Sequence, residues 1–180
     1  MSFALIFLVL AALWALITYN NFITLRGRVD NAWAQIDVQL KRRFDLIPNL
    51  VNTVKGYAQH EKETLENVTA ARTKYMSAQT PDEKIKANTE LGGALGRLFA
   101  VAESYPDLKA NASFLDLQEQ LKNTEDKIGF SRQFYNDTAM KYNIGIAKAP
   151  AAIIANVFGF KGRSYFEAEE ESRQSVEVKF

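Results

Sequence analysis

Residues 29–54 read VDNAWAQIDVQLKRRFDLIPNLVNTV, and this stretch decides the fold class. Large apolar residues recur in it at steps of three and four, the spacing that places side chains on one face of an α-helix. The repeating positions are Val29, Trp33, Ile36, Leu40, Phe44, Ile47, Leu50 and Val54. The pattern continues as far as Tyr75. We therefore predict an all-α protein in which this stretch supplies the first core-facing helix.

Pro48 interrupts the stretch, because proline lacks a backbone N–H and its ring clashes with the preceding helical turn. The residue before it, Ile47, is also pushed away from helical angles. The apolar stripe keeps its phase across the proline, which favours a kink over a break. Two alternatives stay open: a bundle of three long helices, or of four if Pro48 breaks the first.

The remaining helices follow from their start and stop signals. Residues 80–83 read TPDE, in which Thr80 can cap a helix, Pro81 suits the first turn and two acids face the positive helix end. That helix should stop near Pro106, and another should run from Asn111 or Ser113 to just before Pro150. The short connections predict an antiparallel, up-and-down bundle.

The N-terminal segment predicts a membrane anchor. No charged side chain precedes Arg26, and residues 3–17 are almost wholly apolar, so residues 1–25 are long enough to span a bilayer. One alternative is a cleaved signal peptide, but the segment lacks a basic start and a small-residue cleavage site. The other alternative is a helix wholly buried in a soluble protein. Arg26 and Arg28 follow the span, which favours a single-pass topology with the C-terminal body in the cytoplasm.

The domain organisation that we expect is an anchor over 1–25, a helical bundle over 26–158 and a tail over 159–180. Residues 151–158 read AAIIANVF and predict a short apolar helix or docking segment, followed by a turn at 159–162. This segment either caps the core of its own bundle or contacts a neighbouring subunit, a partner or the membrane surface. Its candidate contact residues are Ile153, Ile154, Val157, Phe158 and Phe160.

Composition argues against several classes of chemistry. The chain has no cysteine, a single histidine and a net charge of +1, so we expect no thiolate or di-histidine metal site and no nucleic-acid partner. His60 is followed by threonine at position 64, where a zincin helix needs a second histidine. Gly92 and Gly96, in the glycine cluster 92–96, predict a close helix–helix approach. The basic triplet 41–43 predicts a solvated face or a partner contact. We therefore expect no catalytic residue, no metal and no cofactor.

Four polar side chains fall on or beside the predicted apolar faces. They are Arg72, Glu103, Arg132 and Asn136. Buried polar and charged groups need partners. We therefore predict a structural network that fixes helix register, with Arg72 paired to Glu103; a binding or catalytic site is the alternative.

Several phrases of the chain resemble the LemA family. They are RVDNAWAQIDVQLKRRFDLIPNL at 28–50, ESYPDLKAN at 103–111, RQFYN at 132–136 and FGF at 158–160. The resemblance implies an N-terminal membrane helix and an antiparallel four-helix bundle. It implies no established enzymatic activity, and it suggests roles in membrane organisation and scaffolding, with one branch tied to bacterial magnetosome membranes.

The resulting functional hypothesis is a structural or interaction protein of the bacterial cytoplasmic (inner) membrane, without catalytic activity. Its partners would be the bilayer, through residues 1–25, and either further copies of itself or another membrane protein. One alternative is an adaptor for a membrane protease or transporter. A second is an Asp/Glu-based hydrolase, which would need a water-filled cleft where two carboxylates converge.

Overall fold

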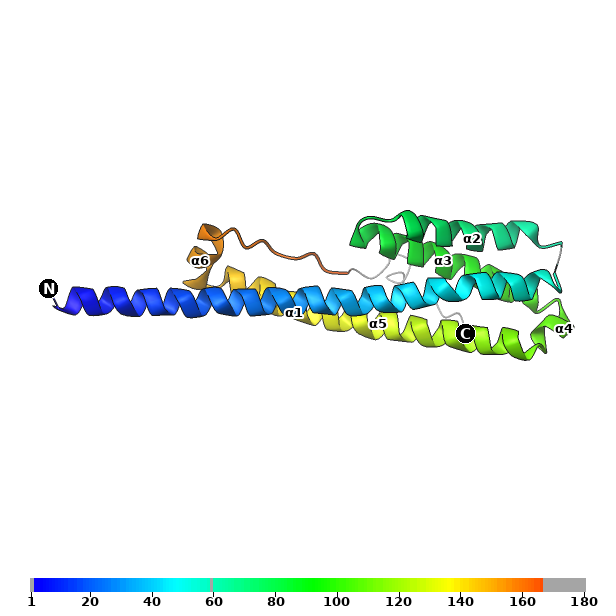
Figure 1. Cartoon of the computed structure of the whole chain (residues 1–180), viewed down its shortest axis with the longest axis horizontal. Coiled ribbons are helices and arrows are strands. Elements are labelled where there is room, and N and C mark those ends of the chain that lie inside the picture. Colours follow the sequence, from blue (N-terminus) through cyan, green and yellow to red (C-terminus); the bar gives the residue numbers. More distant parts are fainter. Residues whose placement is uncertain (1, 59, 167–180) are drawn as a thin grey trace, which may run out of the picture. The chain divides into compact units, whose positions relative to one another are not determined.

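The computed structural model describes residues 2–58 and 60–166, and every regular element in that part of the chain is an α-helix (Figure 1). This confirms the predicted all-α class. The elements are α1 (Ser2–Lys55), α2 (Lys62–Ser77), α3 (Pro81–Ala102), α4 (Pro106–Lys109), α5 (Ala112–Ala147) and α6 (Ala151–Val157).

The helices form two compact units. The first unit holds residues Met1–Gln35 and Phe130–Phe180, and the second holds Ile36–Gly129. Both α1 and α5 are long enough to contribute to each unit, whereas α2, α3 and α4 lie wholly in the second and α6 wholly in the first.

The chain does not break at Pro48, because α1 continues through the proline to Lys55. Ile47 and Leu50, on either side of it, are no more than 1% exposed, and their burial offsets the lost hydrogen bond. The helix ends instead at Lys55. In the turn at Gly56 and Tyr57, the N–H groups of Tyr57 and Ala58 both bond to the carbonyl of Val54. The prediction that Pro48 decides the helix number is therefore wrong: the described residues form four long helices, α1, α2, α3 and α5.

In the second unit α2 and α3 lie side by side as a helical hairpin (Figure 1). The core combines their apolar faces with those of α1 and α5. Its buried members include Ile36, Leu40, Phe44, Leu50, Leu65, Val68, Leu91, Leu98, Phe114, Leu121 and Ile128. The apolar stripe predicted over residues 29–75 therefore faces the core, although it is divided between α1 and α2.

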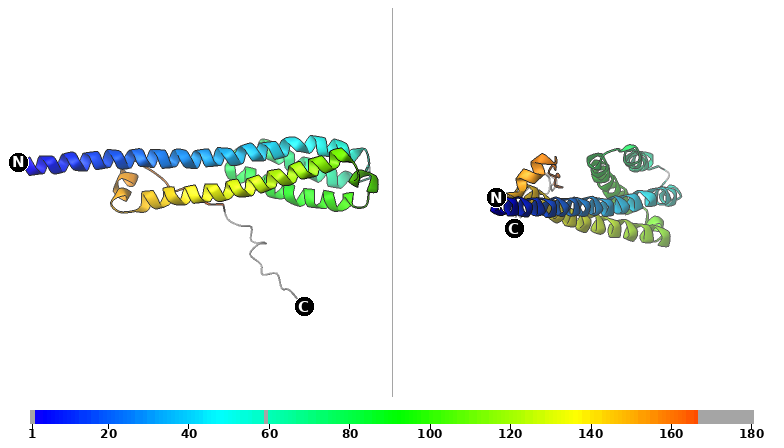
Figure 2. Two further views of the ribbon diagram at one scale, coloured as in Figure 1. Left: turned by 90° about the horizontal axis from the view of Figure 1, so that it is seen from below. Right: turned by 60° about the vertical axis from the view of Figure 1, so that its left-hand side comes forward.

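The first unit joins the N-terminal part of α1 to the C-terminal part of α5, with α6 beside them (Figure 2). Val29, Ala139 and Tyr142 are its buried centre, and Leu25, Tyr135, Ile146 and Phe160 pack against them. Gly159 links α6 to this last residue with a φ of 70°, a left-handed conformation that glycine adopts without strain. The turn covers Phe158 and Gly159, so it overlaps the predicted turn at 159–162 only at Gly159.

The start of α1 has a different environment from the rest of the helix. By length and composition it can cross a membrane, and its most apolar window is 0% buried inside the structure. Phe3, Phe7 and Leu10 are each at least 60% exposed. The predicted tail falls mostly on residues 167–180, which lie outside the described residues.

Candidate functional site

A buried arginine on α1 is the centre of the polar structure in the second unit. Arg43 is 5% exposed, and its Nη1 donates a hydrogen bond of 2.6 Å to Oδ1 of Asn88 on α3. The same guanidinium forms an ion pair with Glu125 on α5, whose side chain is about half exposed. The guanidinium of Arg43 thus connects α1, α3 and α5, and Glu125 lies at the edge of the core.

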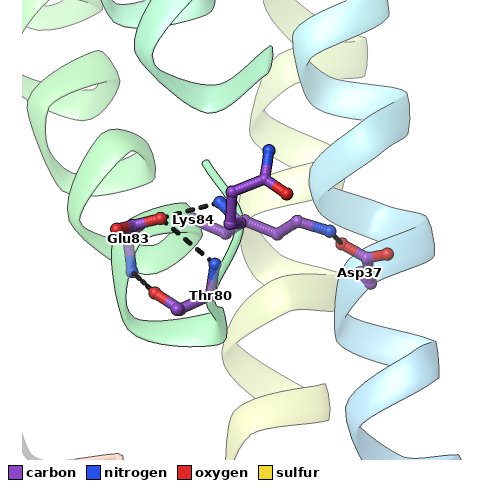
Figure 3. Close-up of polar contacts among 5 residues, drawn as sticks. Asp37, Thr80, Glu83 and Lys84 are labelled. Atoms are coloured by element: carbon purple, nitrogen blue, oxygen red, sulfur yellow. Dashed lines mark hydrogen bonds and ion pairs between the residues drawn. The ribbon is translucent and has the colours of Figure 1, made fainter. Parts of the chain in front are cut away.

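One to two turns earlier along α1, a second ion pair joins α1 to α3. Lys84 Nζ donates to Oδ1 of Asp37 at 2.6 Å (Figure 3). Lys84 lies in the first turn of α3, which begins with a capping box: Glu83 N donates to Oγ1 of Thr80, and the Glu83 carboxylate accepts from the backbone of Thr80 and Gln79. Both backbone N–H groups lower the pKa of Glu83, and the N–H of Gln79 has the larger effect. The predicted helix start is confirmed.

The ring of Tyr75 on α2 packs beside these polar groups. Its ring stacks on Phe44 with centroids 4.0 Å apart and planes within 8°, and Lys84 Nζ lies 5.8 Å from the ring centroid. Burial, followed by the negative charge of Asp37 and a hydrogen bond to it, raises the pKa of Tyr75 to about 12. The phenol therefore stays protonated at neutral pH and can donate a hydrogen bond to the Asp37 carboxylate.

This set of groups, which we call the polar belt (Asp37, Arg43, Tyr75, Lys84, Asn88 and Glu125), pairs each acid with a base. Such pairing satisfies buried charges and fixes the register of helices. Within the described ranges, no group of three or more His, Asp or Glu side chains is placed to hold a metal ion. The geometry favours a positioning role in the bundle.

A second group of polar contacts lies in the first unit, where two asparagines of α5 bind the backbone of a later segment. The side-chain amide of Asn143 donates to the carbonyl of Arg163 and accepts from its N–H, both at 2.8 Å. Asn136 does the same with the backbone of Phe166, again at 2.8 Å in both directions. These two asparagines bind an extended segment, residues 160–166, which we call the strap. Arg163 also pairs with Asp30 of α1 at 2.8 Å.

The apolar segment around α6 is divided between a packed side and an exposed side. Ala155 is buried, and Phe160 contacts the rings of Tyr19 and Phe22 with centroids 5.6 and 5.2 Å apart. Ile154 is partly buried. Ile153, Val157 and Phe158 are 64%, 72% and 59% exposed. The predicted contact surface therefore both covers its own unit and presents an apolar face.

Beside α6 lies a cavity of about 720 Å³, which we call the basic groove. Trp14, Ile17 and Leu25 of α1 form one side. Lys141 and Ile144 of α5 and the nearby Lys148 form the other. The α1 side is therefore apolar at Trp14 and Ile17, with the polar Thr18 and Asn21 beyond them, and the other side includes two lysines.

The family model for LemA matches residues 32–180. The chain belongs to the LemA family. The match covers the whole second unit and most of the first, and the polar belt and the strap lie within the matched residues.

Individual relatives point the same way. This LemA chain is 28% identical over 178 residues to magnetosome protein MamQ 2 of Paramagnetospirillum magneticum and 26% identical over 177 residues to MamQ of Magnetospirillum gryphiswaldense. Each alignment covers 84% of this chain but 65% of the relative, so the chain spans slightly less than two thirds of those proteins. It is also 25% identical over 160 residues to protein LemA of Metamycoplasma hominis, covering 88% of this chain and 73% of that one.

The structure does not form the predicted pair between Arg72 and Glu103, so that prediction is wrong. Glu103 follows the last residue of α3, where its carboxylate is exposed and pairs with Lys109. Arg72 is half-buried on α2, and its Nε has no hydrogen-bond partner among the described residues. The helical stripe placed Glu103 on a buried face, but α3 ends one residue earlier.

The other two predicted polar residues have different surroundings. Asn136 binds the strap, as described above, while Arg132 is half-buried with Nε and Nη2 unpaired within the described part of the chain. The four predicted residues are thus not one network. They divide between the units, with Arg72 and Glu103 in the second and Arg132 and Asn136 in the first.

Sequence reasoning missed three polar residues that the structure uses. Arg43 was assigned to a solvated basic triplet, yet it lies between Leu40 and Ile47 on the buried stripe, a position that its spacing could have revealed. Asn88 gave no such signal. Asn143 follows Asn136 by seven residues, which places both on one face of α5.

The glycines at 92, 93 and 96 of α3 are exposed with open space around them, so the predicted close helix–helix approach is wrong.

Proposed function

We propose that this LemA protein is a single-pass protein of the bacterial inner membrane that holds a helical bundle at the cytoplasmic surface and acts as a scaffold without catalytic chemistry. One observation carries the proposal: α1 runs unbroken from an apolar segment with exposed side chains into a buried core. Apolar surface of that extent is unfavourable in water, at about 25 cal/mol per Å², and a bilayer removes it.

The continuity of α1 supports the scaffold role. A flexible linker would separate the anchor from the folded body, whereas α1 is one helix that contains both the apolar segment and core residues of the bundle. The polar belt then fixes how α2, α3 and α5 pack on that helix. The names of the MamQ relatives, magnetosome proteins, are consistent with work at a membrane, and the membrane-organising role is our extension to this chain.

Membrane insertion is tested by paired aspartate substitutions in the full chain. Leu8→Asp with Leu10→Asp places two charges in the segment that should span the bilayer, each costing about 3 kcal/mol at a helix centre. We expect this variant to be released from membranes by alkaline carbonate. Val38→Asp changes an exposed residue of the second unit and should stay membrane-bound. Equal release of both, or of neither, would contradict the proposal.

Orientation and scaffolding need separate measurements. A C-terminal reporter that is active only in the cytoplasm should be active, because Arg26 and Arg28 follow the span. Sedimentation of the detergent-solubilised full chain should show a particle larger than one chain. A monomer without a bound partner would contradict scaffolding, and a defined complex with one protease or transporter would identify an adaptor instead.

A further inference from the structure

The basic groove lies where α1 changes from apolar to charged. Trp14 and Ile17, which line it, belong to the end of the exposed apolar run, and Leu25, which also lines it, immediately precedes the first charged residue, Arg26. If residues 1–25 span a bilayer, the groove extends from acyl-chain depth at Trp14 to the headgroup layer near Leu25, about 16 Å along α1. Its apolar side then faces acyl chains and its charged side faces phosphates.

The charges of the first unit are strongly one-sided. Its described residues include seven basic side chains and two acidic ones. One of these acids, Asp30, is already paired with Arg163. Lys141 and Lys148 lie seven residues apart, which places both on one side of α5 and its end, and no described acid forms an ion pair with either. An anionic occupant would complement them.

The apolar side of α6 gives independent support for a position in the membrane interface. Phe158 contacts Tyr19 of α1 with ring centroids 4.8 Å apart, so α6 is held beside the end of the apolar run (Figure 2). Ile153 and Val157 nevertheless remain 64% and 72% exposed. A short helix with large apolar residues on its outer side, next to lysines, is typical of an element that lies in the headgroup layer.

We propose that the basic groove binds the headgroup of an anionic phospholipid from the same bilayer, with its phosphate between Lys141 and Lys148 and its acyl chains along Trp14 and Ile17. α6 lies in the interfacial layer beside this lipid. The proposal rests on the proposed membrane span and adds a preferred lipid class to it. A zwitterionic headgroup leaves the two ammonium groups without net compensation, whereas an anionic one supplies it.

Trp14 provides the probe, because it lines the groove and the chain has only one other tryptophan. The full chain with Trp33→Phe is reconstituted in mixed bilayers of phosphatidylcholine and phosphatidylglycerol, with bromine on the acyl chains of one class at a time. Bromine quenches tryptophan at contact. The ratio of quenching by the two brominated lipids therefore reports which class occupies the surroundings of Trp14.

We expect brominated phosphatidylglycerol to quench Trp14 more strongly at equal mole fraction. Lys141→Gln with Lys148→Gln should bring the ratio close to one, since each lysine near an anionic surface changes occupancy by about fivefold, or about 1 kcal/mol. Lys161→Gln removes an exposed cation of the same unit that does not line the groove, and it should preserve the preference.

Three results would overturn the inference in distinguishable ways. Equal quenching by both lipids in the parent chain would remove the anionic preference. A preference that survives the double lysine change would remove the groove as its source. Absence of quenching by either lipid would show that Trp14 does not contact the bilayer, and would contradict the proposed span as well.

Discussion

At the scale of single residues, Arg43 has the most demanding environment in the second unit. A buried guanidinium is destabilising unless its donors are satisfied and its charge is compensated. Asn88 supplies an acceptor from inside the core, and Glu125 supplies the charge from the edge. Because Glu125 is about half exposed, solvent screens the ion pair, and the hydrogen bond to the buried Asn88 contributes more specificity.

Replacing Arg43 with methionine tests this assignment. The change keeps much of the apolar stem but leaves the Asn88 amide without its 2.6 Å partner. We expect a loss of about 1–3 kcal/mol in unfolding free energy, the cost of an unsatisfied buried polar group. Arg42→Met, at the exposed neighbouring position, should change it by less than about 0.5 kcal/mol. Denaturation of the full chain in detergent, followed by circular dichroism, measures both; equal effects would contradict the assignment.

Tyr75 predicts a pH dependence at the alkaline end. Its pKa is about 12 in the folded chain against 10.0 ordinarily, so folding favours the neutral phenol. The resulting stabilisation is present below pH 10 and is lost as the pH rises toward 12. The difference in tyrosinate absorbance between the parent chain and Tyr75→Phe should therefore develop near pH 12. A difference complete by pH 10.5 would show that Tyr75 is not buried beside Asp37.

At the scale of elements, each helix end has a local chemical cause. Thr80 and Glu83 start α3 through a capping box, and Asn111 Oδ1 accepts from the N–H of Phe114 at the start of α5. The turn at Gly56 and Tyr57 ends α1 at Lys55. Capping and propensity effects of this kind are each about 1 kcal/mol. They place the boundaries of helices whose existence depends on burial.

Gly96 offers a stabilising change in α3. It lies inside the helix, it is exposed, and a Cβ there would have no neighbour within 4 Å. Gly96→Ala should raise the unfolding free energy by about 0.5–1 kcal/mol, since alanine loses less backbone entropy in a helix. Gly159→Ala is the contrasting change, because its φ of 70° strains an L-residue, and it should destabilise by about 1 kcal/mol. Thermal denaturation of the full chain measures both, and a destabilising Gly96→Ala would indicate a contact at that position.

The strap gives a prediction at the level of individual amides. Asn143 and Asn136 accept hydrogen bonds from the N–H groups of Arg163 and Phe166. Asn136→Ala with Asn143→Ala should therefore accelerate hydrogen exchange at those two amides at least about tenfold, the factor for about 1.4 kcal/mol. Asn123→Ala changes an exposed asparagine of the same helix and should leave their exchange unaltered. Unchanged exchange in the double variant would mean that the strap is held by other contacts.

At the scale of the whole molecule, two compact units share two long helices. In the first unit Phe160 packs against the centre formed by Val29, Ala139 and Tyr142. The guanidinium of Arg26 lies 5.5 Å from the centre of the same ring. Residues near the C-terminal end of the described chain therefore complete a core that begins near its N-terminal end.

Truncation of the chain tests whether α6 and Phe160 stabilise the core of the first unit. A chain ending at Ala149 loses α6 and Phe160, whereas a control ending at Phe166 keeps both. We expect the shorter chain to lose about 1–3 kcal/mol in the transition reported by Trp33, a fraction of the cost of deleting a fully buried phenylalanine. Amide exchange in α3, which lies wholly in the second unit, should be unchanged. An unaltered Trp33 transition with a smaller sedimenting particle would instead make α6 a contact surface for another molecule.

The sequence by itself determined the helical class, the apolar start of α1 and the cap of α3, and it narrowed the cap of α5 to Asn111 or Ser113. These depend on periodicity and on neighbours within four residues, which are visible in the chain. It also placed Asn136 near a buried face and identified 151–160 as an apolar segment that needs cover, although it left open what covers it.

Only the tertiary structure decided which helix face each polar side chain meets. Pro48 stays inside α1 because the burial of Ile47 and Leu50 exceeds the cost of one backbone hydrogen bond. Arg43 is buried because Asn88 and Glu125, 45 and 82 positions away, arrive beside it. Glu103 is exposed and forms an ion pair with Lys109, six residues later in the chain. A side chain's own spacing sets its direction on the helix, but the partner that makes its burial favourable comes from another helix, and local sequence does not encode that meeting.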